Sequence, residues 1–217
     1  MPTALITGAN RGIGLEFARQ YTADGWTVIA TARHPEAADE LKQLGADILP
    51  LDAADPASID ALAASLSSRT LDVMIANAGV LPRGVDAQGW LNGFATNCIG
   101  PTLLAKTLKG NMAAGGKVIA ITSKMGSIAD NGSGGAIAYR STKAALNAAW
   151  RSLSIDWQGD DIVLAMLHPG WVQTDMGGPG AAIDPKTSVT GMRETIAALA
   201  RDRSGSFLNY DAQDLPW

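Results

Sequence analysis

Short apolar runs alternate along the chain with longer stretches in which apolar residues recur at helical spacing. The apolar runs are almost continuously hydrophobic, and turn residues follow them. Runs of this kind are typical of strands in a parallel sheet that is buried on both faces. They predict strands at Ala4–Thr7, Trp26–Ala30, Ala46–Leu51, Asp72–Ala76, Lys117–Thr122, Ile162–Leu167 and Ser206–Leu208.

The stretches between these runs predict helices. Asp55 ahead of Pro56, for example, is a typical signal of a helix N-terminus. The predicted helices cover Gly14–Ala23, Pro35–Leu44, Pro56–Leu66, Gln88–Lys109, Ala136–Trp157 and Pro185–Ala200. Strands that alternate with helices predict an α/β fold: a doubly wound parallel sheet, or Rossmann fold, of about seven strands with helices on both faces.

Length and composition restrict the class of protein further. The 217 residues suit a single domain spanning 1–217, since no stretch has the composition of a linker. Cys98 is the single cysteine, so a disulfide framework and a multi-cysteine metal cluster are excluded, and no metal is expected. A net charge of −4 provides no electrostatic footprint for nucleic acid. No apolar run is long enough to span a membrane and the first residues do not resemble a secretory leader, which predicts a cytoplasmic protein.

A glycine-rich segment, Thr7–Gly14, follows the first predicted strand. Phosphate binding at such a turn needs backbone N–H groups aimed at the anion, close approach of the chain without a Cβ, and a helix N-terminus behind it. Gly8, Gly12 and Gly14 meet these needs between a strand and a helix. The segment therefore predicts a phosphate site, although a tight strand-to-helix turn alone would also explain its glycines.

Three motifs occur in order along the chain. They are Thr-Gly-x-x-x-Gly-x-Gly at Thr7–Gly14, Asn-Ala-Gly at Asn77–Gly79, and Tyr-x-x-x-Lys at Tyr139 and Lys143. Together they are the marks of short-chain dehydrogenase/reductases, which the chain resembles over essentially its whole length. The segments MGSIADNGSGGAIAYRSTKAALN and FLNYDAQDLPW are similar to the C-factor-like carbonyl reductase branch of that family. The resemblance implies an oxidoreductase that passes a hydride between a nicotinamide and a carbonyl carbon.

Tyr139 and Lys143 are the expected acid–base pair. Residues four apart on a helix share one face, so the two side chains should be neighbours. A phenol has an ordinary pKa near 10, and a nearby ammonium is expected to lower that pKa. The resemblance implies that Tyr139 protonates the nascent alkoxide during reduction, and that Lys143 also holds the nicotinamide ribose.

The resemblance implies two further catalytic residues, Asn97 and Ser123. The serine of the family precedes a glycine by three positions, which selects Ser123 ahead of Gly126 as the donor to the substrate carbonyl, with Ser127 as the alternative. The matching asparagine of the family bends its helix and anchors a water linked to the lysine. Asn97 stands in the middle of a predicted helix, where asparagine is locally unfavourable, and is the candidate for that role.

The second predicted strand leads into Arg33 and carries no acidic residue where an NAD site usually has one. Arginine pairs well with phosphate, and Arg11 in the glycine turn can flank the same charge, so the pattern favours NADP(H) over NAD(H). The resemblance adds contacts to the rest of the cofactor. The expected cofactor-binding residues are Gly8, Asn10, Arg11, Gly12, Ile13, Gly14, Arg33, Asp52, Ala53, Asn77, Ala78, Gly79, Tyr139, Lys143, Pro169, Gly170, Val172 and Thr174.

The segment at about 171–200 is expected to cover the substrate. It is rich in glycine and alanine, and Trp171, Met125, Ile128 and Met176 could supply an apolar wall beside it. This composition favours a small apolar ketone or aldehyde as substrate.

Partners and an alternative function complete the prediction. The family often dimerises through the helix that carries Tyr139, so a homodimer or homotetramer is expected, with no nucleic-acid or membrane partner. The alternative is a dinucleotide-binding regulatory or signalling protein on the same fold, because a fold does not determine a function.

Overall fold

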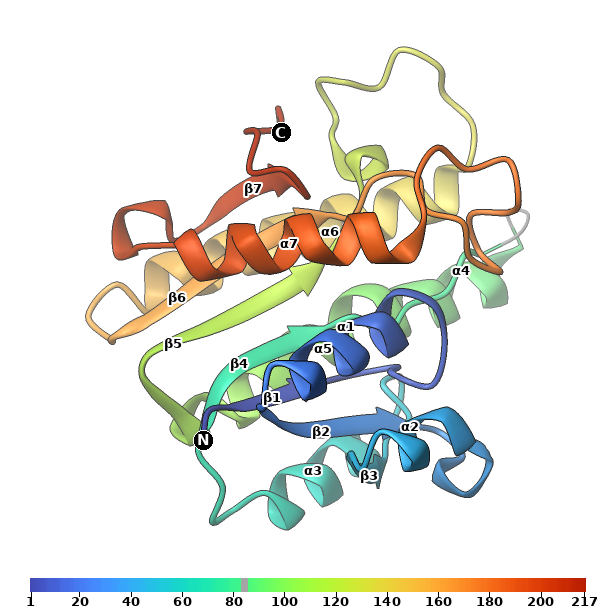
Figure 1. Cartoon of the computed structure of the whole chain (residues 1–217). Helices are drawn as coiled ribbons and strands as arrows, with labels where there is room; N and C mark the ends of the chain where they lie inside the picture. The colour runs from blue at the N-terminus through green and yellow to red at the C-terminus, as the bar shows by residue number, and fades with distance from the viewer. Residues whose placement is uncertain (83–85) are drawn as a thin grey trace.

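Within the described residues, 1–82 and 86–217, every strand of the computed structural model runs parallel in one sheet (Figure 1). The strands are β1 (Thr3–Ile6), β2 (Thr27–Ala32), β3 (Asp47–Pro50), β4 (Leu71–Ala76), β5 (Met112–Ile121), β6 (Ile162–His168) and β7 (Ser206–Asn209). Their order in the sheet is β3-β2-β1-β4-β5-β6-β7. The predicted doubly wound α/β fold is confirmed.

Helices cover both faces of the sheet. They are α1 (Gly12–Ala23), α2 (Asp39–Gln43), α3 (Pro56–Ser65), α4 (Ala87–Phe94), α5 (Gly100–Thr107), α6 (Ile137–Asp156) and α7 (Pro185–Ala198). One core cluster joins the sheet to α1 and α7, with Phe17 and Met192 fully buried, and the other joins its opposite face to α6, with Trp150 fully buried. Neighbouring residues of β1 serve both clusters, Ile6 the first and Leu5 the second, because successive side chains of a strand point to opposite faces. Among the described helices, none combines the length and the apolar composition that crossing a bilayer requires.

The structure corrects two of the predicted helices. Residues 35–44 form a 3-10 turn, η1 (Pro35–Ala37), followed by the short α2, because Ala38 between them leaves the helical region of the backbone with φ −96° and ψ 57°. The long helix expected at 88–109 is divided into α4 and α5 by one π-helical turn, η2 (Ala95–Ile99). Such a turn contains a wider hydrogen-bonded ring than an α-helix and is common at functional sites.

The largest difference at a strand boundary lies at the start of β5. β5 begins at Met112 rather than Lys117, because Met112 pairs with Leu71 of β4 before the register of the two strands shifts. A second 3-10 turn that matters for the site, η4 (Lys124–Gly126), follows the other end of β5.

The carboxyl ends of β1 and β4 meet where the sheet reverses its winding. From β1 the chain moves outward to β2 and β3, then returns to β4 on the other side of β1. Just beyond β1, Thr7 N donates a hydrogen bond at 3.0 Å to the carbonyl of Ile75, near the end of β4, so the segments that follow the two strands start side by side. Doubly wound sheets bind their ligands at this switch point, and the residues that follow β1 and β4 are the place to seek a site.

Candidate active site

Tyr139 and Lys143 lie on successive turns of α6, and both side chains are buried. Lys143 Nζ lies 5.9 Å from the centre of the Tyr139 ring and donates a hydrogen bond to the Ile121 carbonyl at 2.9 Å. Ile121 is the last residue of β5, so the end of this strand determines where the ammonium group lies. The phenol and the ammonium are therefore neighbours, as their spacing predicted.

Burial controls the protonation of both groups. It raises the pKa of the Tyr139 phenol above its ordinary value of 10.0, while a hydrogen bond with the Ser123 side chain acts in the opposite direction. Burial also lowers the pKa of Lys143 to about 8. The pKa of Tyr139 is therefore raised and not lowered as predicted, because the loss of solvent around the phenol is the largest effect.

Two serines flank η4. The Ser123 oxygen accepts a hydrogen bond from Met125 N at 3.1 Å, and its hydroxyl hydrogen faces the Tyr139 phenol rather than a backbone carbonyl. The Ser127 hydroxyl instead donates to the Trp217 carbonyl at 3.2 Å and accepts from Asp130 N at 3.0 Å. Because a hydroxyl has one hydrogen, this geometry favours Ser123 over Ser127 as the donor to a ligand.

Asn97 lies in the π-helical turn η2 and is fully buried. Its Oδ1 accepts a hydrogen bond from Val80 N at 2.8 Å, and its Nδ2 donates to the Val80 carbonyl at 2.9 Å and to Thr142 Oγ1 at 3.0 Å. A Cβ placed on Gly79 would lie 3.3 Å from Asn97 Oδ1 and 3.8 Å from Lys143 Nζ. Asn97 therefore joins η2 to the segment after β4 and to α6, close to the ammonium group.

Gly8 and Asn77 give the glycine-rich turn its shape. Gly8 has a φ of +62°, and a Cβ there would lie 2.9 Å from Ala78 Cα, so conformation and packing both require glycine. Asn77 Nδ2 donates hydrogen bonds to the carbonyls of Thr7 at 2.9 Å and Gly8 at 3.2 Å. The Asn77 side chain therefore holds the turn after β1 from the end of β4.

The turn leads into the N-terminus of α1, and its geometry fits the phosphates of a dinucleotide. Gly12, the first residue of α1, has a φ of +54°, and in the described structure Arg11 at the cap position makes no side-chain bond to the first N–H groups of the helix. N–H groups of this kind point at a bound anion. Glycine is required at position 14 for a different reason, since a Cβ there would lie 2.6 Å from Asn77 Nδ2. Packing within the chain therefore explains two of the three glycines, Gly8 and Gly14, without a ligand.

The charged residues expected at the cofactor come after the carboxyl ends of β1, β2 and β3. Arg11 forms an ion pair with Asp175 at 3.2 Å, and both side chains are largely exposed. Arg33 follows β2 and is also exposed. Asp52 follows β3 and accepts a hydrogen bond from Ala54 N at 2.9 Å. Two guanidinium groups are thus available for an anion on this side of the glycine turn.

Three further residues of the expected cofactor-binding set lie in or near the glycine turn. Asn10 is exposed in the glycine turn, and Ile13 is half-buried against the core cluster of α1. Ala53 borders a small recess together with Ala78 and Gly100. These positions connect the glycine turn with the ends of β3 and β4.

Residues 169–184 form a lobe beside the glycine turn. A Cβ placed on Gly12 would lie 3.3 Å from Thr174 Cγ2, so the lobe contacts the turn. Ile183 N donates to the Trp171 carbonyl at 3.1 Å, and Gln173 N donates to the Ile183 carbonyl at 2.9 Å, which closes the lobe on itself. The lobe contains the expected cofactor residues Pro169, Gly170, Val172 and Thr174.

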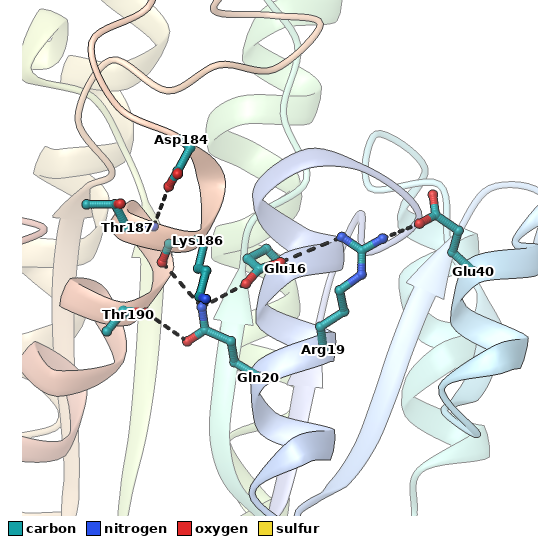
Figure 2. Close-up of polar contacts among 8 residues, drawn as sticks. All are labelled: Glu16, Arg19, Gln20, Glu40, Asp184, Lys186, Thr187 and Thr190. Carbon is teal, nitrogen blue, oxygen red and sulfur yellow. Dashed lines mark hydrogen bonds and ion pairs between the residues drawn. The ribbon is translucent and has the colours of Figure 1, made fainter.

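The far end of the lobe is attached to α1 through α7. Asp184 caps α7 by accepting a hydrogen bond from Thr187 N at 2.7 Å. Gln20 on α1 donates to the Lys186 carbonyl at 3.3 Å and accepts from Thr190 Oγ1 at 3.4 Å, as Figure 2 shows. The lobe is therefore fastened to the helix that begins at the glycine turn.

Arg140 is a residue near the site that the sequence did not indicate. Its guanidinium donates hydrogen bonds to the carbonyls of Gly134 at 3.1 Å, Gly135 at 3.2 Å and Met125 at 3.4 Å. It therefore orders the loop that separates Ser123 from α6. Its place directly after Tyr139 was the only signal in the sequence, and that place does not reveal where an arginine side chain points.

Comparisons of the chain with a family model and with known proteins agree on one protein family. A family model described as short chain dehydrogenase matches residues 2–182, a range that includes Asn97, Ser123, Tyr139 and Lys143. A Myxococcus xanthus protein named C-signal is 41% identical over 164 residues, which cover 72% of this chain and 99% of that protein. A Rhodococcus sp. (strain AD45) 1-hydroxy-2-glutathionyl-2-methyl-3-butene dehydrogenase is 33% identical over 230 residues, which cover 100% of both chains.

A solved structure is also similar over the whole chain. The crystal structure of an NADPH-bound carbonyl reductase from chicken fatty liver has a TM-score of 0.94 and 36% sequence identity. The match covers 100% of this chain and 99% of the chicken chain.

Proposed function

The chain belongs to the short chain dehydrogenase family, and we propose that it is an NADP(H)-dependent carbonyl reductase that converts a small apolar ketone or aldehyde to its alcohol. One observation carries this proposal: Tyr139, Lys143 and Ser123 converge beside a glycine turn that fits a dinucleotide. The similarity to C-signal and to a carbonyl reductase agrees with the branch of the family that the sequence indicated.

NADP(H) is the cofactor that the chain fits. The chicken carbonyl reductase is solved with NADPH, and the glycine turn of this chain can receive the phosphates of the same molecule. Arg11 and Arg33 provide forked donors for a 2′-phosphate, and β2 ends without the acidic residue that an NAD site usually carries there. Bound NADPH would supply the hydride that reduces the carbonyl carbon.

Residues of the chain then act on the carbonyl oxygen of the substrate. The Ser123 hydroxyl donates its hydrogen to that oxygen and stabilises the negative charge that develops on it. Tyr139 passes its phenolic proton to the alkoxide, which leaves a phenolate. Lys143 offers its remaining ammonium hydrogens to the ribose and stabilises the phenolate by its charge, and Asn97 holds the surrounding elements together.

Two regions of the chain determine what can reach this oxygen. We assign the role of covering the substrate to residues 171–184 of the expected segment, because the remainder is mostly α7, whose Val189 and Met192 are buried in the core. Trp171, Met176 and Ile128 are exposed apolar side chains of the lobe and of the segment after η4, which supports an apolar substrate.

The remaining predictions are proposals of the same kind. We propose that residues 1–217 make one domain, since β1 near the beginning and β7 near the end pair within one sheet. Self-association as a homodimer or homotetramer, and a cytoplasmic location, stay predictions from the sequence. A regulatory protein that only binds a dinucleotide, the alternative function, would have no need of Tyr139.

The test is binding and turnover with both nicotinamide cofactors. We expect NADPH to bind more tightly than NADH, measured by the fluorescence of the reduced nicotinamide. Oxidation of NADPH by aromatic and aliphatic carbonyl compounds should fall by about 10²–10⁴-fold in Tyr139→Phe, while NADPH binding is retained. Tight binding without turnover across the panel would favour the regulatory alternative, and activity confined to charged, sugar-like carbonyls would contradict an apolar substrate.

A further inference from the structure

The chain turns back along the edge of the sheet after β7. Asn209 N donates a hydrogen bond to the Gln213 carbonyl at 2.8 Å, and Leu215 N donates to the Phe207 carbonyl at 2.9 Å. These bonds return the polypeptide alongside β7, at the end of the chain marked C in Figure 1. The returning residues, 213–217, here called the return segment, end at Trp217.

Trp217 joins the return segment to the turn formed by residues 127–130. Its carbonyl oxygen accepts hydrogen bonds from Ala129 N at 2.7 Å and from the Ser127 hydroxyl at 3.2 Å. Its indole ring lies 5.7 Å from the Phe207 ring, measured between centres, so the side chain is anchored on β7. One backbone carbonyl thus satisfies two donors of a turn that is 90 positions away in the sequence.

The 127–130 turn is directly coupled to Ser123. Ser123 caps the N-terminus of η4, and the turn begins at the residue after η4. Gly126, the last residue of η4, is pressed against α6: a Cβ there would lie 2.9 Å from the Lys143 carbonyl carbon. Only the three residues of η4 separate Ser123 from Ser127, so this short turn connects the Ser123 hydroxyl to the turn that Trp217 contacts.

We propose that Trp217 is a positioning residue for carbonyl reduction. Its indole ring, packed against Phe207, fixes the position of the carbonyl that accepts from Ser127 and Ala129, and this contact keeps the Ser123 hydroxyl directed at the substrate carbonyl. The proposal rests on the proposed function, in which Ser123 donates to that carbonyl. Trp217 acts through the turn and not by contact with the reacting atoms.

The exposure of Trp217 separates this role from general stabilisation. Trp217 is 48% exposed, so replacing it removes less buried apolar surface than replacing a core residue such as Trp150. The effect of removing it should therefore be concentrated in the turn and in the placement of Ser123.

The experiment compares Trp217→Ala and Ser127→Ala in the full chain with a matched control, Arg203→Gln. Arg203 forms an ion pair with Asp214 at 2.7 Å, so its substitution disturbs the return segment without removing a contact to the turn. Two independent readouts are needed. Amide hydrogen exchange at Ala129 reports the contact itself, and steady-state kinetics report kcat together with the KM for NADPH.

We expect Trp217→Ala to accelerate exchange at Ala129 and to lower kcat about 10-fold, with the KM for NADPH unchanged. Ser127→Ala should lower kcat in the same way, and the double variant should be no worse than either single variant, because both interrupt one connection. Arg203→Gln should behave as the unsubstituted chain. If Trp217→Ala does not fold, Ser127→Ala provides the same readouts.

Faster exchange at Ala129 with an unchanged kcat would overturn the positioning role and leave the proposed function intact. An equal loss of kcat in Arg203→Gln would also overturn it, since the effect would then be general. NADPH binding without turnover in the unsubstituted chain would overturn the proposed function, and the positioning role with it.

Discussion

His168 ends β6 beside the candidate site, and its Nδ1 is buried with no hydrogen-bond partner among the described residues. Burial, helped by the charge of Lys124, lowers the pKa of this imidazole to about 4. A histidine in an unfolded chain has a pKa near 6.5, so between these pH values the unfolded chain binds a proton that the native chain does not. His168 therefore makes the native state less stable as the pH falls from 6.5 toward 4.

Replacing this residue should reduce the sensitivity of the fold to acid. We expect the free energy of unfolding of the unsubstituted chain to lose about 2–3 kcal/mol through His168 between pH 6.5 and 4, and His168→Gln to remove that part of the loss. Urea unfolding at several pH values measures it. His34→Gln, at the exposed histidine of the chain, is the control, and an unchanged acid dependence in His168→Gln would contradict the expectation.

At the scale of elements, the site is assembled from the ends of strands. Arg11 precedes α1 and Arg33 follows β2, so the two guanidinium groups come from neighbouring parallel strands. The ion pair of Arg11 with Asp175 is exposed, and such pairs contribute little. A bound phosphate can therefore compete for Arg11, because charge-assisted bonds from arginine to phosphate are stronger.

These two arginines should determine the choice between cofactors. We expect Arg11→Ala and Arg33→Ala each to raise the Kd for NADPH about 10-fold, with little change in the Kd for NADH, because only NADPH carries the 2′-phosphate. Fluorescence titration with both cofactors measures this. Arg69→Ala is the control, since Arg69 pairs with Asp47 at the start of β3, at the opposite end of the strands from Arg11 and Arg33. Equal weakening of NADH binding would show that the arginines do not recognise the 2′-phosphate.

At the scale of the whole molecule, α6 has one side in the core and one in solvent. Leu146 and Trp150 are buried on the inner side, whereas Ala148, Ser152 and Ile155 are exposed on the outer side. Small residues let a second helix approach closely, so this outer side suits contact between two copies of the chain.

Self-association through this face can be measured directly. We expect light scattering to report at least twice the mass of one chain, and Ser152→Arg to reduce it to the mass of a monomer, because a long charged side chain prevents close packing of helices. Ser68→Arg, at an exposed serine away from α6, should leave the mass unchanged. A monomeric mass for the unsubstituted chain would contradict the expected self-association.

The sequence by itself determined the features that depend on nearby residues. Apolar runs placed β4 to within one residue, because local periodicity reflects backbone preference and the burial of successive side chains. The spacing of Tyr139 and Lys143 predicted their proximity, because helix geometry alone brings residues four apart together. The ordered motifs likewise indicated the family.

Only the tertiary structure decided the features that depend on distant segments. Asn97 lies in a π-helical turn and bonds Val80, an arrangement that a helical pattern does not contain. The pKa of Tyr139 is raised rather than lowered, because the whole fold buries the phenol and this effect exceeds that of the Ser123 hydrogen bond. The spacing ahead of Gly126 selected Ser123 and left Ser127 as the alternative, and only the bond from Ser127 to Trp217 separates the two hydroxyls. A chain expresses its local preferences before it folds, whereas burial and long-range hydrogen bonds exist only once remote segments have packed together.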